Sequence, residues 1–286
     1  MVNGRQSVQD GLMRRPSIRI TLVMIALAAA TAVVVGDLVH RSTGRKLREA
    51  ILAELQPVVL KNCTIERFGS ANDGGYLMCE NLIKPLDAAY SYGVGANDDW
   101  GCDVSRRYHV PVHEYDCFDP ARPTCKGGTL VFHDECVGNQ TGDRDSHFFD
   151  TLQNQIMKNG NAGRHLIIKM DIEGAEWESL LATPDELLAS IPQIAMEMHG
   201  FDDPRILQAL RKLKHNFYLV NLHFNNWSCT PKAAPLPAWA YQGLWVNKRI
   251  GMLDPEAPVP APMSPLNAPD SPTWPDCQLA SPPPKR

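Results

Sequence analysis

The sequence predicts an α/β protein with one doubly wound, mostly parallel β-sheet, and three observations support this fold class. Strand patterns alternate with helix patterns between about residues 58 and 253, as in strands that are joined by crossover helices. Hydrophobic residues make up 44% and charged residues 21% of the chain, close to the averages for soluble globular proteins. The alternating region also has the length of a single α/β domain.

The overall charge excludes one class of protein. The chain has 286 residues, and its 28 lysines and arginines against 32 aspartates and glutamates give a net charge of −4. A strongly basic nucleic-acid-binding protein is therefore excluded, and we expect no nucleic acid among the partners. The average hydrophobic content equally excludes a membrane protein with many spans and a chain that is disordered throughout.

The N-terminal region predicts a membrane anchor. A basic segment (1–19) precedes an uncharged apolar run (20–36) that reaches the lower limit of about 17 residues for crossing a bilayer as a helix. We interpret the run as a signal anchor, and expect a single-pass membrane protein of type II with a luminal or extracytoplasmic domain. A cleaved signal peptide, with Ala30-Thr31-Ala32 at the cleavage site, would instead give a secreted protein, and an Arg-rich transit peptide is a third interpretation. Basic residues flank the run on both sides, so charge alone does not fix the orientation.

Two further segments flank the predicted domain of residues 58–253. Residues 37–57 are expected to form a helical stem, in which Ser42 or Thr43 caps a helix with an apolar stripe of Leu47, Ile51 and Leu55. Residues 254–286 are rich in proline and almost free of aliphatic side chains. Such a segment buries too little apolar surface to offset its ordering entropy, so a disordered tail is predicted there.

Short apolar runs bounded by turn residues predict the strands of the sheet, and Leu166–Ile172 is the most apolar of them. The predicted strands are Ala88–Gly93, Val112–Phe118, Thr129–His133, Leu166–Ile172, Ile194–Met198, Phe217–Leu222 and Leu244–Val246. Four helices are predicted between them. The first runs from Asn97 or Asp98 through Tyr108, and the second is capped by Asp145 or Ser146, with Phe148, Leu152 and Ile156 on one face. The third covers Ala175–Leu181, and the fourth is capped by Asp203, with Pro204 at its first position.

The first predicted strand ends in a glycine turn that is suited to a ligand. Ligands of doubly wound sheets bind beyond the carboxyl ends of the strands. Gly93 and Gly95 allow a tight turn and a close approach of the backbone to a ligand, although an ordinary turn is the alternative. Asp98 occupies the place of the third glycine of a dinucleotide fingerprint. The carboxylates of Asp98 and Asp99 disfavour a pyrophosphate at this helix start and suit a ligand with an ammonium or sulfonium group.

Acidic residues close the following strands. Asp119 follows the second strand, where a carboxylate accepts the hydroxyl hydrogens of a ribose in adenosine-binding folds. Asp116 is the competing candidate, and either one is alternatively a turn residue before Pro120. Asp171 closes the central strand within Lys169-Met170-Asp171-Ile172-Glu173-Gly174-Ala175-Glu176-Trp177, for which a helix-capping network is the alternative explanation.

Histidines also occur at the strand ends. Glu197 and His199 close the strand after Asp171, and His133 closes the third strand. Each histidine taken alone is more often structural than catalytic. A histidine and a carboxylate that meet at one edge of the sheet are nevertheless suited to act as a general base toward an acceptor hydroxyl.

Gly93-Val94-Gly95, Phe118-Asp119-Pro120 and above all the segment from Lys169 to Glu176 resemble FkbM-type S-adenosylmethionine-dependent methyltransferases. The upstream Arg67-Phe68-Gly69 and Asn72-Asp73-Gly74-Gly75-Tyr76 resemble a membrane-anchored or secreted methyltransferase-like branch. The resemblance spans about residues 64–247. It implies a Rossmann-like sheet of seven strands (the class I methyltransferase fold), S-adenosyl-L-methionine as cofactor, and O-methylation as the activity.

The resemblance also implies roles for single residues. Gly93 and Gly95 would line the cofactor, with Asp98 nearby, Asp119 would bind its ribose, and Asp171 would lie beside the methionine moiety or the acceptor. In-line methyl transfer needs alignment, proton removal and exclusion of water, so no metal is expected. For catalysis we expect Glu197 or His199 as the base and Asp171 as the group that orients the acceptor. The acceptor is expected to be a hydroxyl of a glycan or a small molecule.

The cysteines and sequons bear on the compartment. Eight cysteines occur without any CxxC pair, which argues against a zinc site and leaves buried thiols or several disulfides open, with Cys117 expected in the core. Glycosylation sequons begin at Asn62, Asn139 and Asn226.

Two alternative functions also stay open. One is a membrane-anchored glycosyltransferase that uses Asp143-Arg144-Asp145 as a D-x-D motif, and the other is a methyltransferase fold that binds without catalysing.

Overall fold

The structure is a computed structural model that describes residues 43–258, 260 and 266–277. The predicted basic segment, the signal anchor and the first residues of the stem lie outside the described residues. From Arg45 onward the chain forms one compact unit. Within the described residues, no helix combines the length and the apolar character that a membrane crossing requires.

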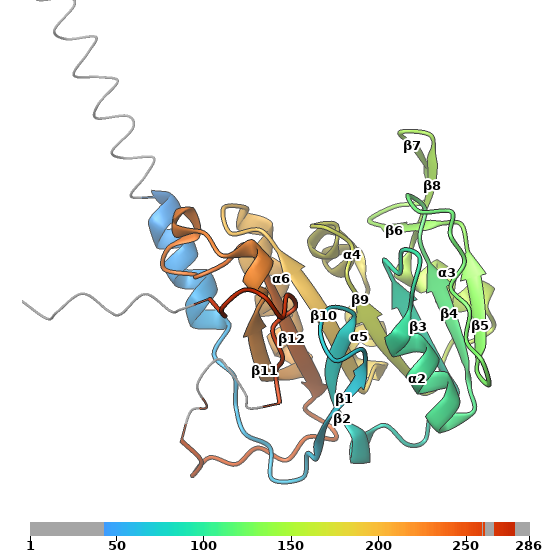
Figure 1. Ribbon diagram of the computed structural model, residues 1–286, viewed down its shortest axis with the longest axis horizontal. Helices are drawn as coiled ribbons and strands as arrows, with labels where there is room; N and C mark the ends of the chain where they lie inside the picture. Colours follow the sequence, from blue (N-terminus) through green and yellow to red (C-terminus); the bar gives the residue numbers. More distant parts are fainter. Residues whose placement is uncertain (1–42, 259, 261–265, 278–286) are drawn as a thin grey trace, which may run out of the picture. The chain divides into compact units, whose positions relative to one another are not determined.

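A seven-stranded sheet forms the centre of the unit, in the order β11-β12-β10-β9-β3-β4-β5 (Figure 1). The neighbours from β10 to β5 pair in parallel, whereas β12 is antiparallel to both β10 and β11. The predicted α/β class and the number of strands are confirmed, and the sheet is mixed. Its strands are β3 (Ala88–Tyr92), β4 (Pro111–Tyr115), β5 (Thr129–His133), β9 (Leu166–Met170), β10 (Gln193–His199), β11 (Phe217–Phe224) and β12 (Ala240–Asn247).

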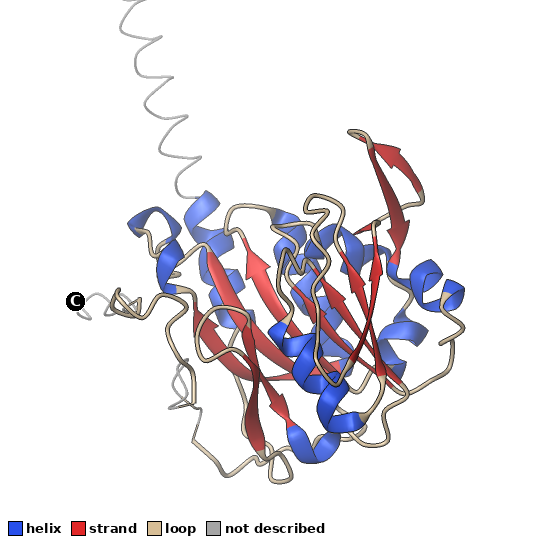
Figure 2. Ribbon diagram, turned by 45° about the vertical axis from the view of Figure 1, so that its right-hand side comes forward, coloured by secondary structure: helices blue, strands red, loops and turns tan. Residues whose placement is uncertain are grey.

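Both faces of the sheet are covered by other elements. Successive side chains of a strand point to opposite faces, so each strand contributes to a buried cluster on either side. Ile168 and Met196 belong to one buried apolar cluster, whereas their chain neighbours Ile167 and Ala195 belong to the other. Figure 2 shows helices on both sides of the strands. The covering elements are α2 (Asp99–Tyr108), α3 (Leu152–Lys158), α4 (Glu176–Ala182), α5 (Asp185–Ser190), α6 (Pro204–Asn216), the hairpin of β1 (Ile65–Gly69) and β2 (Gly75–Cys79), and the short helices η1 (Glu80–Leu82), η2 (Asn226–Ser228) and η3 (Pro231–Ala233).

The helix that was predicted as part of a stem packs against the domain. Residues 43–54 are helical, and Ile51 and Leu55 are fully buried in the first apolar cluster. Glu54 also forms ion pairs with Arg211 and Lys214 of α6. The apolar stripe seen in the sequence is thus the face that this helix buries in the domain core.

Two predicted helix caps are confirmed, and one helix prediction is wrong. Asp98 caps α2 by accepting from the Gly101 amide, and Asp203 caps α6 by accepting from the Arg205 amide. The helix predicted from Asp145 or Ser146 is instead a strand in its first part, and α3 begins only at Leu152, after its cap Thr151.

The reason is a β-hairpin. β7 (Gly142–Arg144) pairs antiparallel with β8 (His147–Thr151), and β6 (Cys136–Gly138) completes a three-stranded sheet. Asp145 and Ser146 both have positive φ, 51° and 68°, as the two central residues of a type I′ turn require. β7 and the start of β8 project beyond the large sheet (Figure 1).

All eight cysteines are paired, so the alternative of buried thiols is excluded. The bonds are Cys63–Cys79, Cys102–Cys125, Cys117–Cys136 and Cys229–Cys277. Cys117, expected in the core of a strand, lies beyond the end of β4 and is covalently linked to the first residue of β6.

Part of the tail that was predicted to be disordered packs on the domain, which corrects that prediction for residues 266–277. Asp270 and Ser271 are buried, and the bond to Cys229 holds Cys277. The buried Asn226 amide donates to the carbonyls of Ser271 and Trp274, so this sequon is not open to glycosylation in the folded chain. Composition alone predicts disorder here because it takes no account of a covalent link to a distant residue.

Candidate functional site

A cavity of about 290 Å³ lies at the carboxyl ends of β3, β4 and β9. The segments that follow these strands line it together with residues of β6 and β8. Three of the motifs that carry the resemblance contribute to its wall, namely the glycine turn, Phe118 and the segment after Lys169. Its lining residues are Gly93, Gly95, Tyr115, Asp116, Cys117, Phe118, Glu135, Cys136, Val137, Phe149, Asp171, Ile172, Glu173 and Ala175.

Only glycine fits the backbone conformation and the space at position 93. Its φ is +70°, and a Cβ atom added there would lie 1.6 Å from the carbonyl oxygen of Asp171. The Gly93 amide donates to the Tyr115 carbonyl over 2.9 Å, and the Asp171 amide donates to the Tyr92 carbonyl over 3.0 Å. The ends of three strands therefore meet at Gly93, and a larger residue would separate them.

Of the two candidate ribose ligands, Asp116 lines the cavity and Asp119 does not. One Asp116 oxygen accepts from the Gly95 amide over 2.9 Å, and the other accepts from the amides of Phe118 and Asp119. Asp119 accepts from the Ala121 amide, which is the turn role that was weighed against a binding role. We therefore expect Asp116 rather than Asp119 as the ribose ligand, although Asp119 Oδ2 lies only 3.9 Å from the position that a Cβ atom on Gly95 would take.

Asp98 is absent from the cavity wall, so its expected place beside the cofactor is not supported. Its carboxylate caps α2 and is only 7% exposed, next to the fully buried Glu114 on β4. Burial and the nearby charge of Asp98 raise the pKa of Glu114 to about 9, so Glu114 is neutral at physiological pH.

Glu114→Gln is therefore expected to stabilise the protein at pH 8. Glu114 ionises above about pH 4.5 in the unfolded chain but only near pH 9 in the folded one, so its contribution to stability falls as the pH rises between these values. Gln has a similar shape and no proton to lose, and we expect a gain of about 4–5 kcal/mol at pH 8 and almost none at pH 4. Urea unfolding at both pH values measures it. Glu66→Gln at an exposed position is the control, and an equal gain at both pH values would contradict the explanation.

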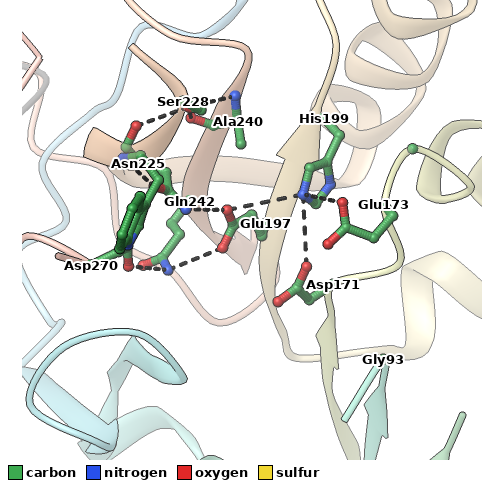
Figure 3. Close-up of polar contacts among 12 residues, drawn as sticks. Gly93, Asp171, Glu173, Glu197, His199, Asn225, Ser228, Ala240, Gln242 and Asp270 are labelled. Carbon is green, nitrogen blue, oxygen red and sulfur yellow. Dashed lines mark hydrogen bonds and ion pairs between the residues drawn. The ribbon is translucent and has the colours of Figure 1, made fainter. Parts of the chain in front are cut away.

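Asp171, Glu173, Glu197 and His199 converge beside the cavity (Figure 3). The Nε2 atom of His199 lies 3.8 Å from Asp171 Oδ1, 3.6 Å from Glu173 Oε2 and 3.9 Å from Glu197 Oε1. The structure therefore brings together the three predicted catalytic residues, Asp171, Glu197 and His199. Glu173, whose side chain is 80% exposed, completes the group on the solvent side.

Buried groups fix the position of His199. Its Nδ1 atom lies 2.6 Å from the carboxylate of Glu176, which is fully buried at the start of α4 and also accepts from the His199 amide. Trp177 donates from Nε1 to the His199 carbonyl over 2.6 Å. Burial alone lowers the pKa of His199, but the hydrogen bond and the charge of Glu176 outweigh it and raise the pKa to about 9.

A second group of polar residues, Asn225, Gln242 and Asp270, supports Glu197. Asn225 donates to Glu197 over 2.7 Å, and Gln242 donates to both Glu197 and Asp270. Burial and the charges of Asp171 and Asp270 raise the pKa of Glu197 to about 8. None of these three residues was predicted from the sequence. Asn225 directly follows β11, but the predicted strand ended at Leu222, two residues before the observed end at Phe224.

Two contacts orient Asp171. Tyr76 donates from its hydroxyl to Asp171 Oδ2 over 2.9 Å. Lys169 lies 3.8 Å from the same oxygen and donates to the carbonyls of Tyr92 and Gly93. The lysine thus links β9 to β3, and the Asn72–Tyr76 motif of the resemblance contributes Tyr76 to the site.

Two other candidates lie elsewhere. His133 contacts His113 on β4, with 3.1 Å between the ring nitrogens, and stacks on Tyr115, so its role is structural. Asp143 and Asp145 of the D-x-D motif lie on the projecting hairpin, where the Arg144 between them pairs with Glu178.

The chain was also compared with known proteins. Neither the models of protein families nor the curated proteins include a match to it.

Proposed function

We propose that the protein is an S-adenosylmethionine-dependent O-methyltransferase with the class I methyltransferase fold, related to the FkbM type that its motifs resemble. The observation that carries the proposal is the cavity at the carboxyl ends of β3, β4 and β9. The strand order reverses between β3 and β9, since β3 is followed in the chain by β4 on one side and the later strand β9 lies on the other. Ligands of open α/β sheets bind at such a switch point.

The lining of the cavity suits this cofactor. The glycine turn lines the cavity, and Asp116, which follows β4 and also lines it, is the proposed acceptor for the ribose hydroxyls. Asp116, Glu135, Asp171 and Glu173 give the wall a negative character that favours a sulfonium cation. The Cys117–Cys136 bond, whose two cysteines both line the cavity, ties the segment after β4 to β6.

The acceptor hydroxyl is proposed to approach from the side of Asp171 and Glu197. Transfer forms a bond from the acceptor oxygen to the methyl carbon and breaks the bond from carbon to sulfur, while the acceptor proton passes to a base. Glu197 or His199 is the proposed base, and Asp171 is proposed to orient the hydroxyl. Because pKa values of about 8 and about 9 keep both groups largely protonated at neutral pH, the rate of transfer should rise as the pH increases through this range. A glycan or a small molecule is the proposed acceptor. Unchanged transfer in both Glu197→Gln and His199→Ala, each folded, would exclude this assignment.

The compartment is proposed on separate evidence. Four disulfides form and persist in oxidising surroundings, which supports a luminal or extracytoplasmic domain. Together with the apolar run (20–36), they support a membrane protein held by a type II signal anchor, with a secreted protein as the alternative. The cofactor would then have to be supplied on that side of the membrane.

Calorimetric titration of the oxidised full chain with S-adenosylmethionine tests cofactor binding. We expect one site per chain, and expect Asp116→Asn to weaken it about tenfold or more, because it loses a charged acceptor of ribose hydrogen bonds. Asp119→Asn is the matched control and should bind like the natural chain. No heat at millimolar cofactor would contradict the proposal, and so would equal effects of the two variants. Binding without transfer to any acceptor would favour the non-catalytic alternative.

A further inference from the structure

We propose that Asp171, Glu173 and His199 form a binding site for a divalent transition-metal cation of the Mn²⁺ type. One ligand atom from each residue lies within 4.8 Å of the others. Asp171 and Glu173 follow β9, and His199 is the last residue of β10, so two adjacent parallel strands bring the three side chains together. The inference rests on side-chain geometry and holds whether or not the chain transfers methyl groups.

The spacing fits a shared ion better than direct hydrogen bonds. His199 Nε2 lies 3.8 Å from Asp171 Oδ1 and 3.6 Å from Glu173 Oε2, beyond the usual hydrogen-bond range. Ligand atoms about 2.1 Å from one cation lie about 3.0–3.5 Å apart at octahedral or tetrahedral angles. The two distances from Nε2 would have to shorten by a few tenths of an ångström, and the two carboxylate oxygens, which lie within 4.8 Å of each other, would be brought together by a movement of the exposed Glu173 side chain.

A second, independent observation is the way in which His199 is held. Its side chain is only 8% exposed, and its Nδ1 atom is fixed 2.6 Å from the fully buried Glu176. Metal-binding histidines almost always donate their other ring N–H to such a carboxylate, which directs the remaining nitrogen at the metal. Here that remaining nitrogen, Nε2, is aimed at Asp171 and Glu173.

Asp171 is held in a similar way. Tyr76 occupies its Oδ2 atom with a hydrogen bond of 2.9 Å, while Oδ1 is the oxygen nearest to His199 Nε2. Thus, in both His199 and Asp171, a buried partner binds one of the two possible ligand atoms. The other atom, Nε2 or Oδ1, is left for the ion. Partners of this kind fix ligand orientation in metal sites.

The charge balance and the donor set indicate the class of ion. Glu197 is a third carboxylate, with Oε1 3.9 Å from His199 Nε2, and Lys169 Nζ lies 3.8 Å from Asp171 Oδ2. Carboxylate oxygens suit Mg²⁺, Ca²⁺ and Mn²⁺, whereas the imidazole favours transition metals, so a mixed set points to the Mn²⁺ type. Because Asp171 and Glu173 also line the cavity, an ion here would present an open position toward any ligand bound there.

Titration of the metal-free, oxidised full chain with Mn²⁺ tests the proposal without any cofactor, with free Mn²⁺ followed by electron paramagnetic resonance. We expect one site per chain and coupling of a nitrogen nucleus to the bound ion. His199→Ala should abolish the nitrogen signal and weaken binding at least tenfold, and Glu176→Gln should weaken it about 10–100-fold while the nitrogen signal persists. Glu173→Gln changes an exposed side chain, should leave the fold intact, and should also weaken binding about tenfold or more.

Asp145→Asn on the projecting hairpin is the matched control and should bind Mn²⁺ like the natural chain. If Asp145→Asn lost Mn²⁺ binding while Glu173→Gln kept it, the ion would be bound at the D-x-D motif, and the proposal would be overturned. Preference for Ca²⁺ over Mn²⁺ would exclude the imidazole as a ligand. The absence of stoichiometric binding of Mn²⁺ would overturn the proposal outright.

Discussion

Gly93→Ala is expected to lower the free energy of unfolding by about 2–5 kcal/mol and to abolish cofactor binding in the proposed function. The positive φ of Gly93, +70°, strains any residue with a side chain. The added Cβ atom would in addition lie 1.6 Å from the Asp171 carbonyl oxygen, so β3 and β9 must move apart. Urea unfolding measures the loss of stability, and calorimetry measures the loss of cofactor binding.

Gly127→Ala separates the two causes. Gly127 has a similar φ of +83°, but nothing lies within 4 Å of the position that its Cβ atom would take. We therefore expect only the conformational strain, about 1–2 kcal/mol, and unchanged cofactor binding. If the two variants lost equal stability, the contact between Gly93 and Asp171 would have no energetic importance.

Replacing both Cys229 and Cys277 by serine is expected to have the second large effect. The bond spans a sequence separation of 48 residues, for which the chain-entropy relation gives a loss of about 4 kcal/mol. Residues 266–277 should then open from the domain more often, because only non-covalent contacts remain, among them the hydrogen bonds of Asn72, Asn221, Asn226 and Gln242 and the contact between Trp227 and Trp274. Urea unfolding measures the loss of stability, and limited proteolysis measures the release of the segment.

The variant lacking Cys63 and Cys79 is the control, since that bond spans only 16 residues and should cost about 3 kcal/mol. It should also leave the segment after residue 266 as resistant to proteases as in the natural chain. Equal protease sensitivity in both variants would contradict the specific link between Cys277 and the packing of the tail.

The sequence predicted the parts of the fold that depend on local pattern. The apolar runs located all seven strands of the large sheet, because a strand buried on both faces is apolar along its length. Asp203 and Asp98 were found as caps, since capping uses residues next to each other in the chain. The turn at Asp145 and Ser146 was missed because neither residue is the glycine that usually marks two consecutive positive φ angles.

The candidate site was predicted only in part, for a similar reason. Asp171, Glu197 and His199 follow adjacent parallel strands, so their meeting at one edge follows from the order of the elements. Which of Asp116 and Asp119 reaches the cavity depends on the path of the backbone after β4. No sequence pattern indicates this path. Asp270 was out of reach, since it arrives at the site through a disulfide between distant residues.

The packing of residues 266–277 also determines where this protein has to be cut for expression. A boundary drawn from composition, after residue 253, would keep every strand of the large sheet and discard Cys277 with the segment it holds. Asn226 would then lose its acceptors, Gln242 would lose Asp270, and Cys229 would be left as an unpaired thiol prone to wrong disulfides. The smallest piece worth producing therefore ends after Cys277, in a host compartment that forms disulfides.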